Sequence, residues 1–335
     1  MNRAEIPEHN LALDLVRITE AAALASARWL GRGDKQSGDR AAVEAMRLSF
    51  SAMQIRGRVI IGEGEKDRAP MLYNGEEVGT GTGPEMDVAV DPVEGTKLLA
   101  TGRPNAISVT GMAPGGSISP PGPSHYMRKM VVHPGVRDRV DPEAPVPENL
   151  SKIASALDKS MGDLVVFVLD KPRHQGLIQQ IREAGARIQL HSEGDVAGAL
   201  MAVDPLCEVD LLLGTGGTPE GILSACAIRA MGGEMYCSLD PQSEEERKAL
   251  QEQEADLDRI LTTRDLIQGE DVYFSATGIS GGTFLPGVRY SGNGAVTHSL
   301  VTRGKTGTLR RIEATHSWDR LMRFSAVEYG PSSRD

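Results

Sequence analysis

The chain has 335 residues, which predicts about two domains, and it carries a formal net charge of −10 with only 4% aromatic residues. This composition argues against nucleic acid or an anionic membrane as the main partner, because both call for clustered cations or stacking rings. The three cysteines show no paired spacing, the N-terminus lacks a signal-like apolar stretch, and no apolar run reaches membrane-spanning length. We therefore expect a cytoplasmic protein.

Apolar residues at helical spacing predict a helix over residues 11–30, which ends before Gly31. A loop over residues 31–39 leads into a second helix, whose buried stripe reaches Met53. Short strands are expected at residues 58–62, 88–90 and 106–111. A loop rich in Gly and Pro then covers residues 112–124, and an extended segment covers residues 127–133.

Three prolines within residues 141–148 mark the best candidate boundary. Residues 1–150 would form an N-terminal metal-binding α+β subdomain, and residues 151–325 a C-terminal α/β subdomain that binds sugar phosphate. In the second part, strands at 164–169, 187–190, 209–213 and 234–238 alternate with helices at 175–184, 196–203 and 220–231. That alternation predicts a mainly parallel sheet covered by helices, followed by a helix near 242–261 and further strands near 272–276 and 309–313.

The most informative segment is Asp91-Pro92-Val93-Glu94-Gly95-Thr96, directly after the apolar run at residues 88–90. We expect Pro92 to end the strand, which places two carboxylates and a hydroxyl at its carboxyl end. Such oxygens can hold Mg²⁺ or Mn²⁺ against a phosphate. The alternative is a solvated surface turn. We favour the metal site because a carboxylate at the end of a buried strand is costly unless it is paired or metal-bound.

Three further acids are candidates for the same site. Glu63 lies between two glycines after an apolar strand, where a solvated turn is an equally good interpretation. Asp39 opens the second predicted helix, so an N-cap is its simplest role, although one carboxylate oxygen would remain for a metal. Glu220 falls in the first turn of a predicted helix, where the helix dipole favours a negative charge with or without a metal.

The candidates for anion and sugar binding follow two predicted strands. Lys171, Pro172 and Arg173 come after the strand at 164–169, where cations can meet a bound anion or simply face solvent. Residues 193–195 (Glu-Gly-Asp) follow the next strand and can accept hydrogen bonds from sugar hydroxyls, although Asp195 could instead cap a helix. Tyr126 follows the loop rich in Gly and Pro, and an ordinary surface tyrosine is its alternative.

Taken together, these segments resemble the class II fructose-1,6-bisphosphatases of the lithium-sensitive phosphatase superfamily. The resemblance runs in family order over nearly the whole chain, through residues 29–35 with Asp39, 61–73, 91–96, 171–174, 193–196, 216–221 and 274–278. The motif at 91–96 alone identifies the superfamily, and the block at 61–73 is more specific.

The resemblance implies a layered αβαβα sandwich with two subdomains and hydrolysis of the 1-phosphate of fructose 1,6-bisphosphate, as in gluconeogenesis. It implies two or three Mn²⁺ or Mg²⁺ ions held by Asp39, Glu63, Asp91, Glu94 and Glu220. Thr96 would orient the attacking water, with Asp39 and Glu63 holding the nearest ion and Asp39 accepting a hydrogen bond from Thr96. The implied substrate-binding residues are Glu94, Gly95, Thr96, Tyr126, Lys171, Pro172, Arg173, Glu193, Gly194, Asp195 and Gly217.

Several alternatives stay open on the sequence alone. Some relatives also hydrolyse sedoheptulose 1,7-bisphosphate, and the motifs do not separate the two activities. An inositol-monophosphatase-like enzyme would share residues 91–96 but would not need the cations at 171–173. A sugar-phosphate sensor without turnover is disfavoured, because Thr96 and every acid are present. We expect a homodimer or homotetramer with a small-molecule sugar bisphosphate as its ligand.

Overall fold

The computed structural model describes residues 10–64, 71–120, 122 and 124–322. Part of the segment at 61–73 that carries the family resemblance, residues 65–70, lies outside this range. The α-helices are α1 (Leu11–Ser26), α2 (Lys35–Phe50), α3 (Thr96–Thr101), α4 (Val146–Ala156), α5 (Gln175–Glu183), α6 (Asp195–Val203), α7 (Thr218–Met231), α8 (Glu244–Glu252), α9 (Thr263–Leu266) and α10 (Trp318–Leu321). Short 3₁₀ turns occur at Ala27–Trp29, Met161–Asp163, Pro172–His174 and Gly304–Thr306.

Two sheets organise the molecule. The first has eight strands in the order β11-β12-β10-β4-β3-β1-β2, with β13 paired to β12. Its strands are β1 (Arg56–Ile61), β2 (Glu77–Val78), β3 (Glu85–Glu94), β4 (Ile107–Pro114), β10 (Tyr273–Gly278), β11 (Arg289–Ser291), β12 (Gly294–Arg303) and β13 (Thr308–Ser317). The second has five strands in the order β7-β6-β8-β5-β9: β5 (Tyr126–Val132), β6 (Val165–Leu169), β7 (Arg187–His191), β8 (Leu211–Gly217) and β9 (Glu234–Leu239).

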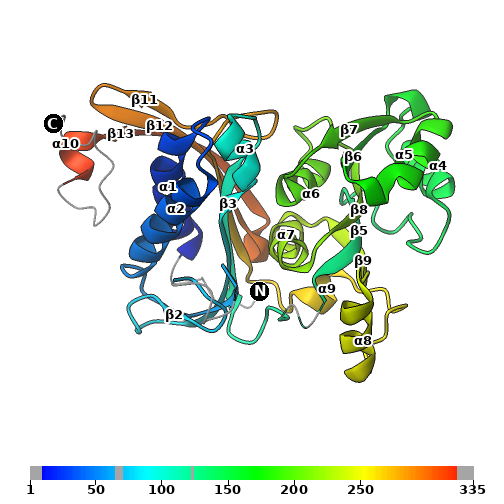
Figure 1. Ribbon diagram of the computed structural model, residues 1–335, viewed down its shortest axis with the longest axis horizontal. Coiled ribbons are helices and arrows are strands. Elements are labelled where there is room, and N and C mark those ends of the chain that lie inside the picture. Colours follow the sequence, from blue (N-terminus) through cyan, green and yellow to red (C-terminus); the bar gives the residue numbers. More distant parts are fainter. Residues whose placement is uncertain (1–9, 65–70, 121, 123, 323–335) are drawn as a thin grey trace, which may run out of the picture.

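The helices and sheets stack in five layers (Figure 1). Helices α1 and α2 cover one face of the first sheet, α6 and α7 lie between the two sheets, and α4 and α5 cover the outer face of the second sheet. The predicted αβαβα sandwich is therefore confirmed. No helix in the described part of the chain is long and apolar enough to cross a membrane.

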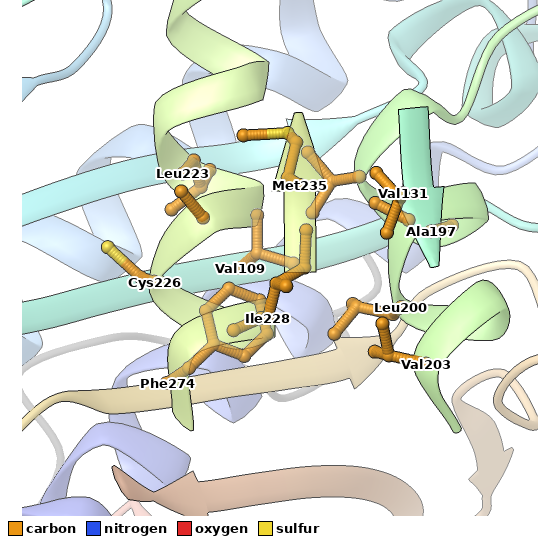
Figure 2. Packing of buried hydrophobic residues seen from close by; sticks show 14 of the residues in the cluster. Val109, Val131, Ala197, Leu200, Val203, Leu223, Cys226, Ile228, Met235 and Phe274 are labelled. Carbon is orange, nitrogen blue, oxygen red and sulfur yellow. The ribbon is translucent and has the colours of Figure 1, made fainter. Parts of the chain in front are cut away.

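The central layer joins the two sheets through one apolar core. Val109 and Phe274 come from the first sheet and Val131 from the second, and Figure 2 shows them meeting side chains of α6 and α7. Burying a side chain of this size stabilises the fold by roughly 1.5–3 kcal/mol. At Gly111 on β4, an added Cβ would lie only 2.8 Å from the Cβ of Cys226, so a glycine lets α7 approach the first sheet. The two sheets are thus packed firmly enough to hold opposite walls of one site.

The sheets do not follow chain order. Strand β5 precedes the proline-rich segment yet pairs in the second sheet, whereas β10–β13 come late in the chain and return to the first. The proline-rich segment also contains the start of α4, because Pro147 occupies its first turn, where a missing N–H costs nothing. The division into subdomains near residue 150 stays a prediction.

Several sequence predictions about individual elements are wrong in an informative way. The second sheet is mixed and not mainly parallel, since β5 pairs antiparallel with both β8 and β9. The helix expected over residues 11–30 turns into a 3₁₀ turn after Ser26. The helix expected near 242–261 ends at Glu252, and the strand expected to stop at residue 111 continues to Pro114. The other predicted strands and helices of the second half are present within a few residues of their expected ends.

Candidate active site

A cavity of about 520 Å³ opens between the two sheets, where the carboxyl ends of β1, β3, β6 and β8 meet the first turns of α6 and α7. Most of the predicted site residues line it: Asp39, Glu63, Asp91, Glu94, Gly95, Thr96, Lys171, Arg173, Glu193, Gly194, Asp195, Gly217 and Glu220. Tyr126 and Pro172 do not. Residues up to 181 positions apart in the sequence, Asp39 and Glu220, thus share one hollow.

One side of the cavity is negative, and we call Asp39, Glu63, Asp91, Glu94 and Glu220 the acidic wall. Asp39 does not cap a helix as predicted: α2 begins at Lys35, and its N-cap is Asp34, whose Oδ1 accepts the Ser37 N–H at 3.0 Å. Asp39 therefore sits in the second turn of α2. There, Gly38 allows close packing, because an added Cβ would lie 2.8 Å from Leu99 Cδ2. Both Asp39 carboxylate oxygens are free of a capping role.

The Asp-Pro motif forms a bulge in the last residues of β3, so Pro92 does not end the strand as predicted, although β3 ends at Glu94 and both carboxylates lie at its carboxyl end. The register with β4 moves from Asp91 opposite Val109 to Glu94 opposite Ile107, so β3 carries one extra residue. Asp91 Oδ1 accepts the N–H of Val93 at 3.0 Å, which holds its carboxylate. A bulge re-aims side chains, and here both Asp91 and Glu94 line the cavity.

Glu94 also reaches across to the second sheet. Its Oε1 accepts the N–H of Val196, in the first turn of α6, at 3.0 Å. A reciprocal contact runs the other way, because the N–H of Lys97 donates to Glu193 Oε2 at 3.1 Å. These two hydrogen bonds join the segment from the end of β3 into α3 to the segment that begins α6.

The acids of this wall repel one another. Burial raises the pKa of Asp91 well above its usual value, and the charges of Glu94, Glu63 and Glu220 raise it further. Burial and then the Glu220 charge raise the pKa of Glu94 to about 7, although the Val196 N–H opposes this. Burial and then Asp39 raise the pKa of Glu63 to about 7. Closely spaced buried carboxylates of this kind require a cation or a proton.

The donor set fits hard divalent cations, which prefer carboxylate oxygens. Asp91 and Glu94 share a side-chain hydrogen bond, and each also accepts a backbone N–H, from Val93 and Val196 respectively. Within the described residues, no three His, Cys, Asp or Glu side chains already surround one point as ligands.

Thr96 begins α3 directly after Gly95, which adopts a left-handed conformation with φ of 86°. A side chain is rarely found in that conformation, so glycine fits the sharp turn from β3 into the helix. Thr96 lines the cavity beside the acids. The expected hydrogen bond to Asp39 does not occur among the described contacts.

The cavity is also lined by two cations, Lys171 and Arg173, which we call the basic wall. Arg173 lies with its guanidinium carbon 5.1 Å from the centre of the Tyr126 ring, so Tyr126 supports the wall without lining the cavity. Arg173 Nε and Nη2 also donate to the Thr215 carbonyl at 3.1 and 2.8 Å. Pro172 opens the 3₁₀ turn that links the two cations.

His174 anchors this turn, a role that the sequence did not reveal. Its Nε2 accepts the Thr215 N–H at 2.8 Å, so its Nδ1 carries the proton and donates to the Leu169 carbonyl at 2.7 Å. Burial lowers the pKa of His174, in keeping with a neutral ring. In the sequence, its position directly after Lys171 and Arg173 was the only indication that His174 has a role at this site.

Asp195 does not cap α6, whose N-cap is Gly194. Its carboxylate instead forms a buried ion pair with Lys129 of β5, which sequence reasoning also missed. A lysine inside an apolar strand was the signal that could have revealed it. Other lining residues without a predicted role are Ile61, Gly62, Gly64, Val90, Val93, Leu169, Ser192, Gly216, Pro219 and Leu223.

Comparison with known proteins agrees with this geometry. Residues 9–316 match the family described as bacterial fructose-1,6-bisphosphatase, glpX-encoded. The chain is 44% identical to the fructose-1,6-bisphosphatase class 2 of Haemophilus influenzae, covering 97% of this chain and 99% of that protein. It is 42% identical to the fructose-1,6-bisphosphatase 1 class 2 of Escherichia coli K12, covering 92% and 96%. The chain therefore belongs to the family of glpX-encoded bacterial fructose-1,6-bisphosphatases.

Proposed function

We propose that the chain hydrolyses the 1-phosphate of fructose 1,6-bisphosphate, giving fructose 6-phosphate and phosphate, with divalent cations bound at the acidic wall. The observation that carries this proposal is that one cavity is lined both by the carboxylates of the acidic wall and by the cations Lys171 and Arg173. A substrate with two phosphates suits that pairing, since each end meets a different kind of charge. Gluconeogenesis is the pathway that such a reaction serves.

In this proposal Asp39, Glu63, Asp91, Glu94 and Glu220 hold two or three Mg²⁺ or Mn²⁺ ions. The chemistry such ions supply is neutralisation of phosphoryl oxygens and a lower pKa for water. Without them, the wall has only protons to relieve the burial and the mutual repulsion that raise the pKa values of Glu63, Asp91 and Glu94.

The residues of the chain then have separate tasks. Thr96 orients a water whose oxygen bonds to phosphorus and which releases a proton to solvent, while the ester P–O bond breaks and the departing sugar oxygen takes up a proton from solvent. Lys171 and Arg173 bind the phosphate that is retained. Glu193, Asp195 and the backbone of Gly95, Gly194 and Gly217 position the sugar, with Tyr126 and Pro172 supporting Arg173.

Phosphate release tests the proposal directly. The purified protein is stripped with a chelator, reloaded with Mg²⁺ or Mn²⁺, and assayed on fructose 1,6-bisphosphate with and without Li⁺. We expect metal-dependent release of one phosphate, no further release from fructose 6-phosphate, and inhibition by Li⁺. No release with either metal across pH 6–9 would contradict the proposal.

Two further substrates separate the competing hypotheses. Inositol 1-phosphate has no second phosphate for the basic wall, so it should turn over at least about tenfold less efficiently than the bisphosphate. A preference for it would favour an inositol-monophosphatase-like enzyme, and tight binding of fructose 1,6-bisphosphate without product would favour a sensor. Sedoheptulose 1,7-bisphosphate presents the same kind of reacting end and completes the comparison.

The proposal extends to the setting of the enzyme. Cys207, Cys226 and Cys237 are free thiols, and Cys226 and Cys237 are buried, in keeping with a reducing cytoplasm. A homodimer or homotetramer is the proposed assembly, and its mass in solution is the measurement that tests it.

A further inference from the structure

A buried lysine, Lys129, contacts residues that line the cavity. Lys129 is in β5, and its side chain is only 2% exposed. Strand geometry points Met127 and Lys129 to the same face, toward α7, while Arg128 between them is exposed. Burying an ammonium group costs free energy unless the group is paired and hydrogen-bonded, so the partners of Lys129 indicate its role.

The partners of Lys129 are two groups of the cavity lining. Its Nζ forms an ion pair with Asp195 Oδ2, and it donates to the carbonyl oxygen of Gly217 at 2.9 Å. Asp195 begins α6, whereas Gly217 ends β8 just before α7. One ammonium therefore ties together two separate segments that both line the cavity.

The surrounding backbone is shaped to admit this pair. A Cβ at Gly216 would lie 2.1 Å from Asp195 Oδ2 and 3.0 Å from Lys129 Nζ. A Cβ at Gly221 would lie 3.4 Å from the same Nζ and 2.4 Å from the sulfur of Met127. Glycines at both positions leave room for the ammonium and its carboxylate partner.

The ion pair also distinguishes Asp195 from the carboxylates of the acidic wall. Within the described part of the chain, Asp195 is the one cavity-lining carboxylate that forms an ion pair with a lysine or arginine. It is near enough for its charge to raise the pKa of Glu94. The Lys129 charge offsets that of Asp195, so its second oxygen remains an acceptor for a neutral donor such as a sugar hydroxyl.

We propose that Lys129 is a positioning residue for substrate binding, which acts through Asp195: the Gly217 carbonyl orients its ammonium, and the ammonium orients the Asp195 carboxylate toward the sugar. This rests on the proposed function, in which Asp195 contacts the sugar. The described polar contacts of Lys129 are with Asp195 and the Gly217 carbonyl and not with an acid that holds the metals, so its loss should affect binding of the sugar more than the chemical step.

The decisive variant is Lys129→Met, which keeps the length of the side chain and removes its charge. We expect the KM for fructose 1,6-bisphosphate to rise at least about tenfold while kcat changes less than about threefold. Calorimetry should show the Kd of fructose 6-phosphate rising by a similar factor. A wild-type KM in Lys129→Met would overturn the proposal.

Lys159 supplies a matched control. It pairs with Asp210 at 2.5 Å, next to the other end of β8, and neither residue lines the cavity. Lys159→Met should lower the thermal midpoint and leave KM unchanged. An equal rise of KM in Lys129→Met and Lys159→Met would show that only general stability is involved, and would also overturn the proposal.

A double-mutant cycle identifies the route of the effect. In an Asp195→Asn background, Lys129→Met should change KM less than about twofold, since its target is already lost. A further tenfold rise in that background would show that Lys129 does not act through Asp195. Lys129→Gln, which keeps an N–H donor, should give a KM between those of the wild type and Lys129→Met.

Two outcomes need separate treatment. If Lys129→Met does not fold, Lys129→Gln decides: a KM raised about threefold or more with kcat retained supports the proposal, and a wild-type KM overturns it. If the wild-type protein itself shows no hydrolysis of fructose 1,6-bisphosphate, then the proposed function fails before Lys129 is tested.

Discussion

The acidic and basic walls of the cavity differ in what stabilises their charges. The acids are buried close together, and burial first and then their mutual repulsion raise the pKa values of Glu63, Asp91 and Glu94. Arg173, by contrast, is exposed at the rim, and both the Thr215 carbonyl and the Tyr126 ring already support it. The acidic wall therefore depends on cations from outside the chain, whereas the basic wall is built before a ligand arrives.

Thr96 tests whether the acidic wall does chemistry as well as binding metal. Thr96→Ala should lower kcat by about 10³-fold, since an oriented proton partner contributes 10²–10⁴-fold, while Mn²⁺ binding by calorimetry stays unchanged. Thr101→Ala is the matched control, because Thr101 ends the same helix and its hydroxyl donates to the Lys97 carbonyl of that helix. A kcat within threefold of wild type in Thr96→Ala would remove the residue from the mechanism.

The repulsion within the acidic wall makes a prediction about stability. Glu94 has a folded pKa of about 7 against an ordinary value of 4.5, so the folded state keeps a proton that the unfolded chain releases. The resulting penalty is absent below pH 4.5, grows as pH rises, and is complete above pH 7. In chelator, Glu94→Gln should therefore exceed wild type in unfolding free energy by about 2–3 kcal/mol at pH 7.5 and by little at pH 5.

Urea unfolding at the two pH values measures this difference. Comparing the variant with wild type at each pH cancels the opposing effect of buried histidines such as His174, whose pKa is lowered. Saturating Mn²⁺ should reverse the order, because it stabilises the intact wall more than the variant. Equal stabilities at pH 7.5 in chelator would show that Glu94 bears no such strain.

Arg173 tests the basic wall. Arg173→Ala should raise the KM for fructose 1,6-bisphosphate about 30-fold with kcat nearly retained, because hydrogen bonds to charged groups contribute about 1.5–3 kcal/mol. Arg182→Ala provides the control, since Arg182 lies in the last turn of α5 and does not line the cavity. An unchanged KM in Arg173→Ala would place the retained phosphate elsewhere.

The smallest predicted effect on activity concerns Gly217, which lies next to the Glu220 carboxylate. At Gly217, an added Cβ would lie 1.9 Å from Glu220 Oε2, although its φ of −61° suits any residue. Gly217→Ala should displace the Glu220 carboxylate, weaken Mn²⁺ binding and lower kcat about tenfold, within the 10–100-fold range seen when the partners of metal ligands are altered. Gly176→Ala, which meets open space in α5, should leave kcat unchanged. Equal activities of the two variants would show that Glu220 tolerates the crowding.

Much of the fold could be predicted from local patterns. The strands around residues 164–169 and 187–190 and the helices near 175–184 and 220–231 follow from hydrophobic periodicity, which depends on neighbours in the sequence. The proximity of Asp91 and Glu94 also follows from their spacing. Their placement in a bulge could not be predicted, because Pro92 suggested that the strand ends there. The strand continues past Pro92 because it pairs with β4, a segment that follows later in the chain.

The sequence by itself determined the order of the motifs, the family and the types of side chain available for metal and phosphate. Only the tertiary structure decided which acids face one cavity, which sheet receives β5, and that Asp195 pairs with Lys129 and does not cap α6. Periodicity reports which side of an element is buried but not what covers it. The partner of a buried charge comes from a distant segment, and packing alone selects it.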